Sequence, residues 1–225
     1  MHCKVKTKPF LTMLKIANIF NRDIKFSMIG TELFAEGVDS ANACLLRMAI
    51  PAEGDEGEFC TDYDKFYSIL NTSKDEDTEI EISDVITIKT GNTKFKLAKY
   101  NIGMSRAIPK MEWHFHANMA FADFASAMAS IANIATIMQI EYKAGQFVMT
   151  GLDGINRVDC VIPVEDAEGP DVIVSVSMDY IKDTILNFRG ADKLRIGLTT
   201  DAPMTAHLKT DEMEMQIILA PRIRD

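Results

Sequence analysis

The sequence predicts an α+β protein built from two similar domains. Three observations predict this class. One segment recurs at a fixed distance along the chain, four short stretches place apolar residues at helical spacing, and many short stretches between them alternate apolar and polar residues. We therefore expect two helices and an antiparallel meander of strands in each half of the chain.

The recurring segment lies at residues 33–42 and returns at residues 147–156. The two copies are 114 positions apart (151 − 37), and the same offset superimposes a helical stretch and two strand stretches. An offset that holds across a helix, two strands and a turn indicates a duplicated unit. Strand–turn–strand segments also look alike in unrelated proteins, so coincidence stays open as the simpler explanation. The identical residues are Gly37 and Gly151, Asp39 and Asp153, and Asn42 and Asn156.

In the first half, apolar spacing predicts helices over residues 10–20 and 61–71, with Thr61 as the N-cap of the second. Pro51 is expected to end the strand before it, and residues 52–58 to form an acidic loop. Strands are expected at residues 24–28, 33–35, 44–50, 79–82, 86–89 and 94–99.

Residues 100–113 have no clear period and are rich in Gly, Ser, Pro and Met, which predicts a linker between domains at 1–99 and 114–225. The second domain should contain helices over residues 119–133 and 178–189 and an acidic turn at 164–170. Strands are expected at residues 138–142, 146–150, 158–163, 172–176, 194–198, 205–208 and 215–219.

The composition is that of an ordinary globular protein, since 47% of the 225 residues are apolar and 25% are charged. The net charge of −9 argues against binding nucleic acid by bulk attraction, although a local basic face stays open. No apolar run approaches the roughly 20 residues that span a membrane, and no signal peptide is recognisable. The four scattered cysteines have no C-x-x-C spacing, so we expect free thiols in a reducing cytoplasm.

The sequence contains no recognisable catalytic or metal-binding motif. His114 and His116 lack a third ligand at suitable spacing, which favours a pair on a strand edge over a metal site. Asp39 and Asp153 each follow a Gly in a turn, where Asp commonly hydrogen-bonds its own backbone. We therefore expect no enzyme, no cofactor and no metal.

Several segments resemble sliding clamps of the proliferating cell nuclear antigen (PCNA) type, in their archaeal form. These segments are residues 36–43, 178–183, 190–196, 202–204 and, most specifically, 219–223. The resemblance covers nearly the whole chain. It implies the DNA clamp fold, with two similar domains per subunit, helices lining a ring hole and antiparallel sheets outside. It also implies a ring of three subunits that encircles duplex DNA without reading its sequence and acts without catalysis.

The resemblance further implies partners and site residues. The partners would be a DNA polymerase, a clamp loader, a nuclease and a ligase, bound through short peptide motifs. The protein itself would be cytoplasmic and associated with the nucleoid. The expected DNA-facing residues are Lys15, Lys65, Lys74, Lys143, Lys182 and Arg189. The expected peptide pocket consists of Val38, Asn42, Ala43, Ile102, Ile108, Pro109, Pro203, Leu219, Ala220 and Pro221. The expected subunit interface consists of Lys94, Lys96, Lys99, Arg157 and Asp159.

Two charge patterns bear on these expectations. The edge at residues 93–100 is lysine-rich and the edge at 156–161 carries Asp159, with Glu165 and Asp166 beyond, so opposite charges should favour head-to-tail closure. Charged residues that merely protect a free edge are the alternative.

The four helical stretches hold four basic and five acidic residues, which predicts a weak positive field in the hole. A mixed ring with more basic subunits, or a platform or inhibitor that does not encircle DNA, therefore stays open beside the homotrimer.

Overall fold

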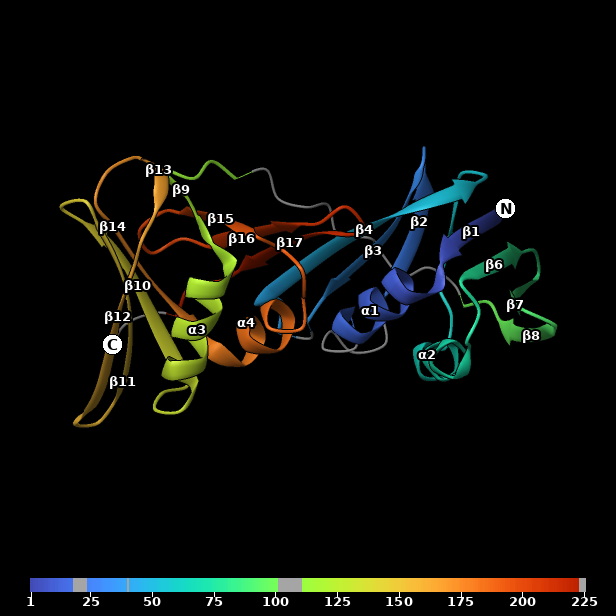
Figure 1. Cartoon of the computed structure of the whole chain (residues 1–225), viewed down its shortest axis with the longest axis horizontal. Coiled ribbons are helices and arrows are strands. Elements are labelled where there is room, and N and C mark those ends of the chain that lie inside the picture. The colour runs from blue at the N-terminus through green and yellow to red at the C-terminus, as the bar shows by residue number, and fades with distance from the viewer. Residues whose placement is uncertain (18–23, 40, 101–110, 223–225) are drawn as a thin grey trace. The chain divides into compact units, whose positions relative to one another are not determined.

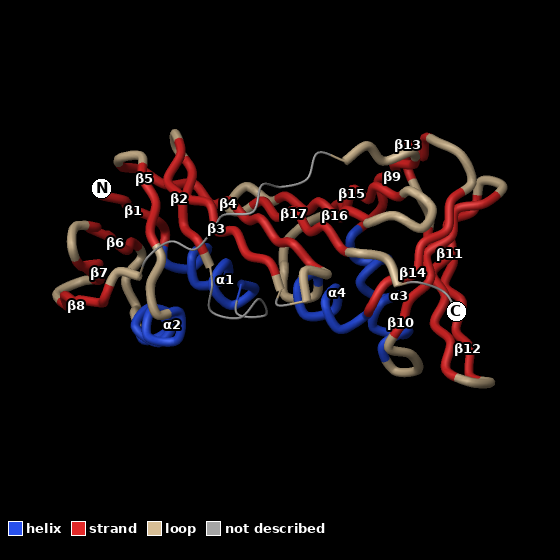
Figure 2. Tube along the Cα trace, turned by 180° about the vertical axis from the view of Figure 1, so that it is seen from behind, coloured by secondary structure: helices blue, strands red, loops and turns tan. Residues whose placement is uncertain are grey.

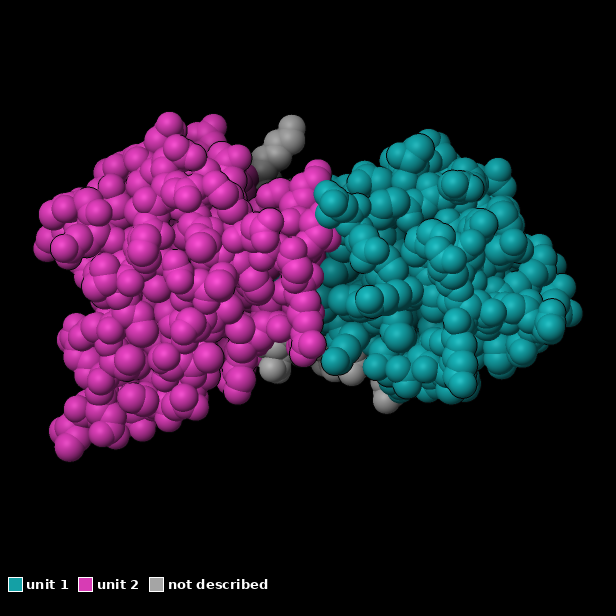
Figure 3. Space-filling model, in the orientation of Figure 1, with its two compact units in different colours: residues 1–108, 211–215 teal, residues 109–210, 216–225 magenta. Residues whose placement is uncertain are grey.

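The computed structural model describes residues 1–17, 24–39, 41–100 and 111–222. The chain divides into two compact units (Figure 3). Unit 1 comprises Met1–Ile108 and Asp211–Met215, and unit 2 comprises Pro109–Thr210 and Gln216–Asp225. Each unit combines two helices with antiparallel strands, which confirms the α+β prediction (Figure 1).

Unit 1 is a single run of antiparallel strands in the order β5-β2-β3-β4-β1-β6-β7-β8. Its helices α1 and α2 pack against each other, and α1 also contacts β1, β3 and β4. The elements are β1 (His2–Lys6), α1 (Thr7–Ala17), β2 (Lys25–Ile29), β3 (Glu32–Val38), β4 (Cys44–Gly54), β5 (Gly57–Phe59), α2 (Tyr63–Thr72), β6 (Asp77–Ile82), β7 (Val85–Thr90) and β8 (Thr93–Ala98).

Unit 2 contains a four-stranded sheet, β12-β11-β10-β14, and a second group of strands in the order β13-β9-β15-β16-β17. The first two residues of β17, Glu214 and Met215, belong to unit 1. Helix α3 contacts strands of both groups and packs against α4 (Figure 2). The elements are β9 (Phe115–Ala120), α3 (Phe121–Ala132), β10 (Ile137–Lys143), β11 (Gln146–Asp153), β12 (Asn156–Ile162), β13 (Glu165–Glu168), β14 (Val172–Ser177), α4 (Met178–Ile185), β15 (Lys193–Leu198), β16 (Met204–Lys209) and β17 (Glu214–Leu219).

The two units repeat the same pairing scheme, which confirms the duplication predicted from the sequence. The 114-residue offset carries α1 onto α3 and β3 onto β11. Strand β1 pairs with β4 and β6 just as β9 pairs with β13 and β15. The close approach of Gly54 to the carbonyl of His2 also recurs, at Gly169 and His114.

Helices α1 and α3 occupy equivalent positions in the two units. Helix α1 begins earlier, and α3 begins later, than the apolar periodicity predicts. The N–H of Thr7 donates to the carbonyl of Glu76 (2.8 Å), and the N–H of Phe121 donates to the carbonyl of Asp192 (2.9 Å). These bonds satisfy a helix-terminal donor immediately after β1 or β9. Helix α1 therefore starts at Thr7 rather than residue 10, and α3 starts at Phe121 because Met119 still belongs to β9.

Two local predictions about the first half were wrong. Asp62 rather than Thr61 caps α2, because its Oδ1 accepts a hydrogen bond from the N–H of Lys65 (3.1 Å). Strand β4 continues through Pro51 to Gly54, and β5 occupies part of the expected acidic loop. Pro51 removes a single donor, and the N–H of Ala52 resumes the pairing by donating to Thr31 (2.9 Å).

Three predictions about the second half also need correction. The expected acidic turn contains the strand β13. This strand pairs with β9, so β9 lies between β13 and β15. His116 consequently occupies an interior strand rather than an edge. Helix α4 ends at Ile185, four residues before the end predicted from apolar spacing (189 − 185).

Aromatic side chains dominate the core of unit 1. The ring of Phe10 contacts those of Phe26 and Phe66 at centroid distances of 6.0 and 5.4 Å, and Phe26 stacks on Phe59. Edge-to-face and offset-stacked rings of this kind add to the stabilisation from area burial. In unit 2, Phe124 occupies the position equivalent to Phe10 and is likewise fully buried.

Candidate functional site

The turn that follows β3 is organised by the buried carboxylate of Asp39. Its Oδ1 accepts a hydrogen bond from the N–H of Cys44 (2.7 Å), and its Oδ2 accepts one from the N–H of Ala41 (3.1 Å). Asn42 has a positive φ of 56°, a conformation that Asn adopts more readily than most residues. Asp39 therefore holds the turn through its side chain, as expected from the sequence. Asp153, in the other unit, is exposed at the end of β11.

The expected peptide pocket draws on both units. In unit 1, Val38 and Ala43 are half-buried on either side of the Asp39 turn, and Asn42 is exposed. In unit 2, Leu219 is buried and Pro203 is half-buried. The pocket as a whole stays a prediction. Ala220 and Pro221 are half-buried, while Ile102, Ile108 and Pro109 lie outside the described residues.

Trp113 contacts Pro203, one of the expected pocket residues, and was not identified from the sequence. Its Nε1–H donates to the carbonyl of Pro203 (3.2 Å), and its ring lies against Gly197, where an added Cβ would sit 2.9 Å from the indole Cγ. The indole thus supports the loop before β16. Trp113 is the single tryptophan of the chain, and its isolation at the start of unit 2 is the one sequence signal that could have drawn attention to it.

Each helix except α3 presents one or two exposed cations. Lys15 lies on α1 and Lys182 on α4, whereas α3 carries Asp123 and no Lys or Arg. Lys65 on α2 forms an ion pair with Asp62 (3.1 Å), and this hydrogen bond raises the pKa of the lysine. The structure therefore offers little positive charge on the helices, in keeping with the sequence. Lys74 follows α2, Lys143 ends β10 and Arg189 follows α4, all exposed.

Lys8 is a cation on α1 that the sequence analysis missed. The helix was expected to begin at residue 10, whereas Lys8 is exposed in its first turn. The backbone bond from Thr7 to Glu76, which sets the start of the helix, joins residues far apart in sequence. No local pattern could have revealed it.

Strands β8 and β12 each pair with a single neighbour within their sheets, so each has an edge open to a further strand. Lys94 and Lys96 are exposed on β8, and Lys99 follows this strand. Arg157 and Asp159 are exposed on β12. Four of the five expected interface residues thus lie on two open strand edges, whereas Lys99 forms a β-bridge with Thr61 of its own chain.

Asp159 already has partners within its own chain. Its Oδ2 lies 2.6 Å from Nε of Arg157, and its Oδ1 accepts a hydrogen bond from Oγ1 of Thr150 (2.7 Å). The Arg157 guanidinium and then the Thr150 hydroxyl hold the pKa of Asp159 below its usual value. Similarly, Glu165 pairs with Lys193. The acidic groups expected to attract the lysine edge are therefore partly neutralised in place.

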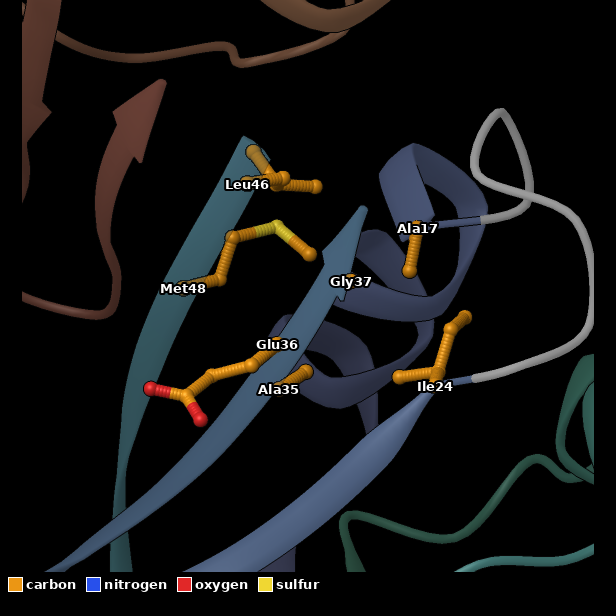
Figure 4. A pocket seen from close by; sticks show the side chains of 7 residues that line it. All are labelled: Ala17, Ile24, Ala35, Glu36, Gly37, Leu46 and Met48. Atoms are coloured by element: carbon orange, nitrogen blue, oxygen red, sulfur yellow. The ribbon is translucent and has the colours of Figure 1, made fainter. Parts of the chain in front are cut away.

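A shallow hollow with no room for a water molecule lies in unit 1 beside the end of α1 (Figure 4). Leu46 and Met48 reach into it from β4, while the Glu36 carboxylate points to the opposite face of the sheet, where it pairs with Arg47 (3.3 Å). The residues that line the hollow include no pair of groups for acid–base chemistry. The other lining residues are Ala17, Ile24, Ala35 and Gly37.

The remaining reactive groups are dispersed. No group of three His, Cys, Asp or Glu side chains able to hold a metal ion occurs among the residues that the structure describes. The four cysteines are free, and burial raises the pKa of the Cys3 thiol to about 11. Such a thiol stays protonated and is a poor nucleophile. Within the described ranges, no helix is both long and apolar enough to cross a membrane.

Known structures match the fold over its whole length. PCNA of A. fulgidus, solved with the C-terminal region of FEN-1 bound, superimposes with a TM-score of 0.90 and 18% identity over 100% of this chain and 99% of that one. This is the fold of a PCNA-type sliding clamp. A PCNA2–PCNA3 complex from Sulfolobus tokodaii matches with a TM-score of 0.84 and 15% identity, over 99% of both chains.

Curated relatives from archaea agree with this fold. The DNA polymerase sliding clamp of Methanocella arvoryzae is 22% identical over 238 aligned positions, which cover 97% of each chain. That of Methanococcus maripaludis is 21% identical over 241 positions, covering 96% of each chain. No family model matches the chain. The similarity thus spans both units of the clamp fold at low sequence identity.

Proposed function

We propose that this chain is a DNA sliding clamp, a ring-forming processivity factor that encircles duplex DNA and tethers a DNA polymerase. The observation that carries the proposal is the whole-chain match to PCNA structures and to archaeal clamps of nearly equal length. The open edges of β8 and β12 supply what a head-to-tail ring requires, since each edge seeks a strand from another subunit.

The proposed domain organisation follows the duplication. Clamp domains at residues 1–99 and 114–225 would be joined by a connecting segment at residues 100–113. The repeated strand pairing of the two units supports two clamp domains. The exposed cations Lys15, Lys65 and Lys182 would contribute to the DNA-facing surface, with Lys74, Lys143 and Arg189 nearby.

Partner enzymes of replication and repair would bind through short peptide motifs. The proposed pocket combines the Asp39 turn with the loop at Pro203 and the end of β17. Such a pocket would present apolar side chains, which suits a peptide with aromatic anchors. Trp113 contacts the Pro203 loop, so its fluorescence provides a direct readout of peptide binding.

The proposed activity is mechanical rather than catalytic. A closed ring slides along DNA because contacts with phosphates carry no sequence information. The proposal requires no cofactor, no metal and no membrane, and it places the protein at the nucleoid in the cytoplasm. The four free cysteines are consistent with a reducing compartment.

Solution mass and retention on DNA test the proposal together. Light scattering at several concentrations should give a mass near three times 25.1 kDa. After loading by a cognate clamp loader, the protein should remain on closed circular DNA and leave when the circle is linearised. Protein that leaves circular and linear DNA at the same rate would contradict encirclement.

A second candidate keeps the fold but changes the role. The near-neutral helices, and α3 in particular, favour a subunit of a mixed ring or a platform or inhibitor that recruits clamp-binding enzymes without encircling DNA. Polymerase extension of a long primed template separates the roles. Stimulation by this chain alone would exclude the mixed ring and the inhibitor.

A further inference from the structure

The two open edges have the same two-sided character. On β8, Phe95 and Leu97 are half-buried and stand opposite the buried Ile88 and Ile86 of β7, so they lie on the core face of the sheet. Lys94 and Lys96 alternate with them and point to the outer face. Apolar groups on one face and cations on the other therefore mark this edge.

On β12, Cys160 stands opposite the buried Met149 and, with Val158, lies half-buried on the face toward α3. Arg157 and Asp159 alternate with them on the outer face, together with Val161, which is 66% exposed. Pairing β8 of one copy with β12 of a second copy would thus bury apolar side chains on the helix-facing side of both strands. The outer faces would bring the charged residues together.

The charges on the outer faces do not match. The outer face of β8 presents Lys94 and Lys96, and Lys96 forms no ion pair in the part of the chain that the structure describes. The facing strand would offer one carboxylate, Asp159, and that carboxylate is already occupied by Arg157 at 2.6 Å. The ion pair of Arg157 with Asp159 therefore has no net negative charge to attract the lysines, and the Arg157 guanidinium still repels them.

We propose that Arg157 weakens the pairing of β12 with β8 of a second copy, by holding Asp159 and by repelling the incoming lysines. The inference rests on the proposed ring and names the residue that sets its strength. Pairing requires Asp159 to exchange Arg157 for a lysine, or else leaves three cations, Lys94, Lys96 and Arg157, on one outer face against a single carboxylate. Like charges on adjacent strands destabilise pairing. The apolar contacts on the helix-facing side oppose this repulsion and hold the subunits together.

This arrangement reverses the usual salt dependence of a charged interface. Salt screens attraction between opposite charges, so it weakens an interface that such attraction holds together. Salt also screens repulsion between like charges, so it tightens an interface that such repulsion opposes. Raising the salt from roughly 0.05 to 0.5 M should shorten the Debye length from more than 10 Å to less than 5 Å. We expect the dissociation constant of the wild-type contact to fall about two- to five-fold over this range, the size of one unfavourable cross-strand charge pair.

The experiment compares subunit dissociation constants, by sedimentation equilibrium, for the wild-type chain, Arg157→Gln and Asp159→Asn at both salt concentrations. Arg157→Gln should associate about two- to five-fold more tightly than wild type at low salt, and its advantage should shrink at high salt. Asp159→Asn should associate more weakly than wild type at low salt. Arg195→Gln is the matched control, since Arg195 is exposed on the interior strand β15 and its loss changes the net charge equally.

The outcomes separate this inference from the proposed function. If the wild-type trimer dissociates more readily at high salt, and Arg157→Gln does not change its dissociation constant, the inference is wrong. The proposed clamp function would be unaffected by that result. A chain that stays monomeric at both salt concentrations, as wild type and as Arg157→Gln, would overturn both the inference and the self-closing ring. An equal effect of Arg195→Gln would attribute the gain to net charge and would also overturn the inference.

Discussion

Unit 1 and unit 2 share a pairing scheme but differ in how continuous it is. In unit 1 the single strand β4 joins β3 to β1, so its eight strands form one run. In unit 2 the equivalent stretch is divided into β12 and β13, which pair with β11 and β9 respectively. Pro163, between them, lacks a backbone donor and fixes its own φ, which favours a break there. Duplication thus conserved the pairing partners but not the continuity of the strand that joins them.

The cores of the two units differ as well. Phe10 and Phe124 occupy equivalent positions, but Phe10 belongs to a cluster of four rings. Among the described residues, Phe124 has no ring contact of this kind. Equivalent positions in a duplicated fold therefore rest on different interactions, and three experiments test how different they are.

The largest effect is expected from truncating the equivalent phenylalanines. Phe10→Ala should lower the free energy of unfolding by about 4–5 kcal/mol and Phe124→Ala by about 3–4 kcal/mol. The difference reflects the ring contacts that only Phe10 makes, each pair contributing about 0.5–1.5 kcal/mol beyond burial. Urea denaturation followed by circular dichroism measures both values. Equal losses at the two positions would show that the four-ring cluster adds nothing beyond apolar burial.

A smaller and more nearly equal effect is expected at Gly54 and Gly169. Both have positive φ, and a Cβ would lie 2.0 Å from the carbonyl oxygen of His2 or 2.2 Å from that of His114. Backbone strain and overpacking together should cost about 3 kcal/mol in Gly54→Ala and in Gly169→Ala. Gly145→Ala is the control, because Gly145 has a φ of +82° but nothing within 4 Å of the added Cβ.

Thermal unfolding of the three glycine variants provides the measurement. The control should lose about 1 kcal/mol, the cost of backbone strain alone. If Gly54→Ala and Gly169→Ala differ from each other by more than either differs from the control, the close approach is not an equivalent feature of the two units.

The duplication and most elements could be predicted from the sequence because they rest on local patterns. Apolar residues at helical spacing located α1 to α4, and the constant offset between Gly37 and Gly151 revealed the repeat. The errors arose where distant backbone groups decide. The carbonyl of Glu76 sets the start of α1, and β9 recruits β13 from a stretch whose composition is that of a turn.

The candidate surfaces were predictable to a different degree. The resemblance to sliding clamps implied that Lys94, Lys96, Arg157 and Asp159 lie on two strand edges, and β8 and β12 each pair with a single neighbouring strand. The sequence could not reveal that Arg157 and Asp159 bind each other, because residues two apart on a strand share a face whether or not they pair. The support that Trp113 gives to the Pro203 loop was equally hidden, since 90 residues separate the two partners.

The smallest expected effect is a difference in acid sensitivity. Four carboxyl groups with lowered pKa values belong to unit 1, whereas unit 2 has Asp159 among the described residues. A carboxyl whose pKa is lower in the folded than in the unfolded chain stabilises the fold above its unfolded pKa of about 4. That contribution is lost as the pH falls through the lowered folded pKa. The four groups in unit 1 and the first cause of each are Glu58 with Lys25, Asp62 with the N–H of Lys65, Asp77 with Lys4, and Glu81 with Lys89.

Acidification from pH 6 to pH 3 should therefore weaken unit 1 more than unit 2. All these groups are at or near the surface, so solvent screening keeps the effect small. Amide hydrogen exchange, corrected for the intrinsic rate at each pH, should show a larger loss of protection in β6 and β7 than in β10 and β11. Asp159→Asn should leave β10 and β11 less sensitive to pH still. A larger loss of protection in unit 2 than in unit 1 would mean that the surface ion pairs of unit 1 do not contribute to its stability.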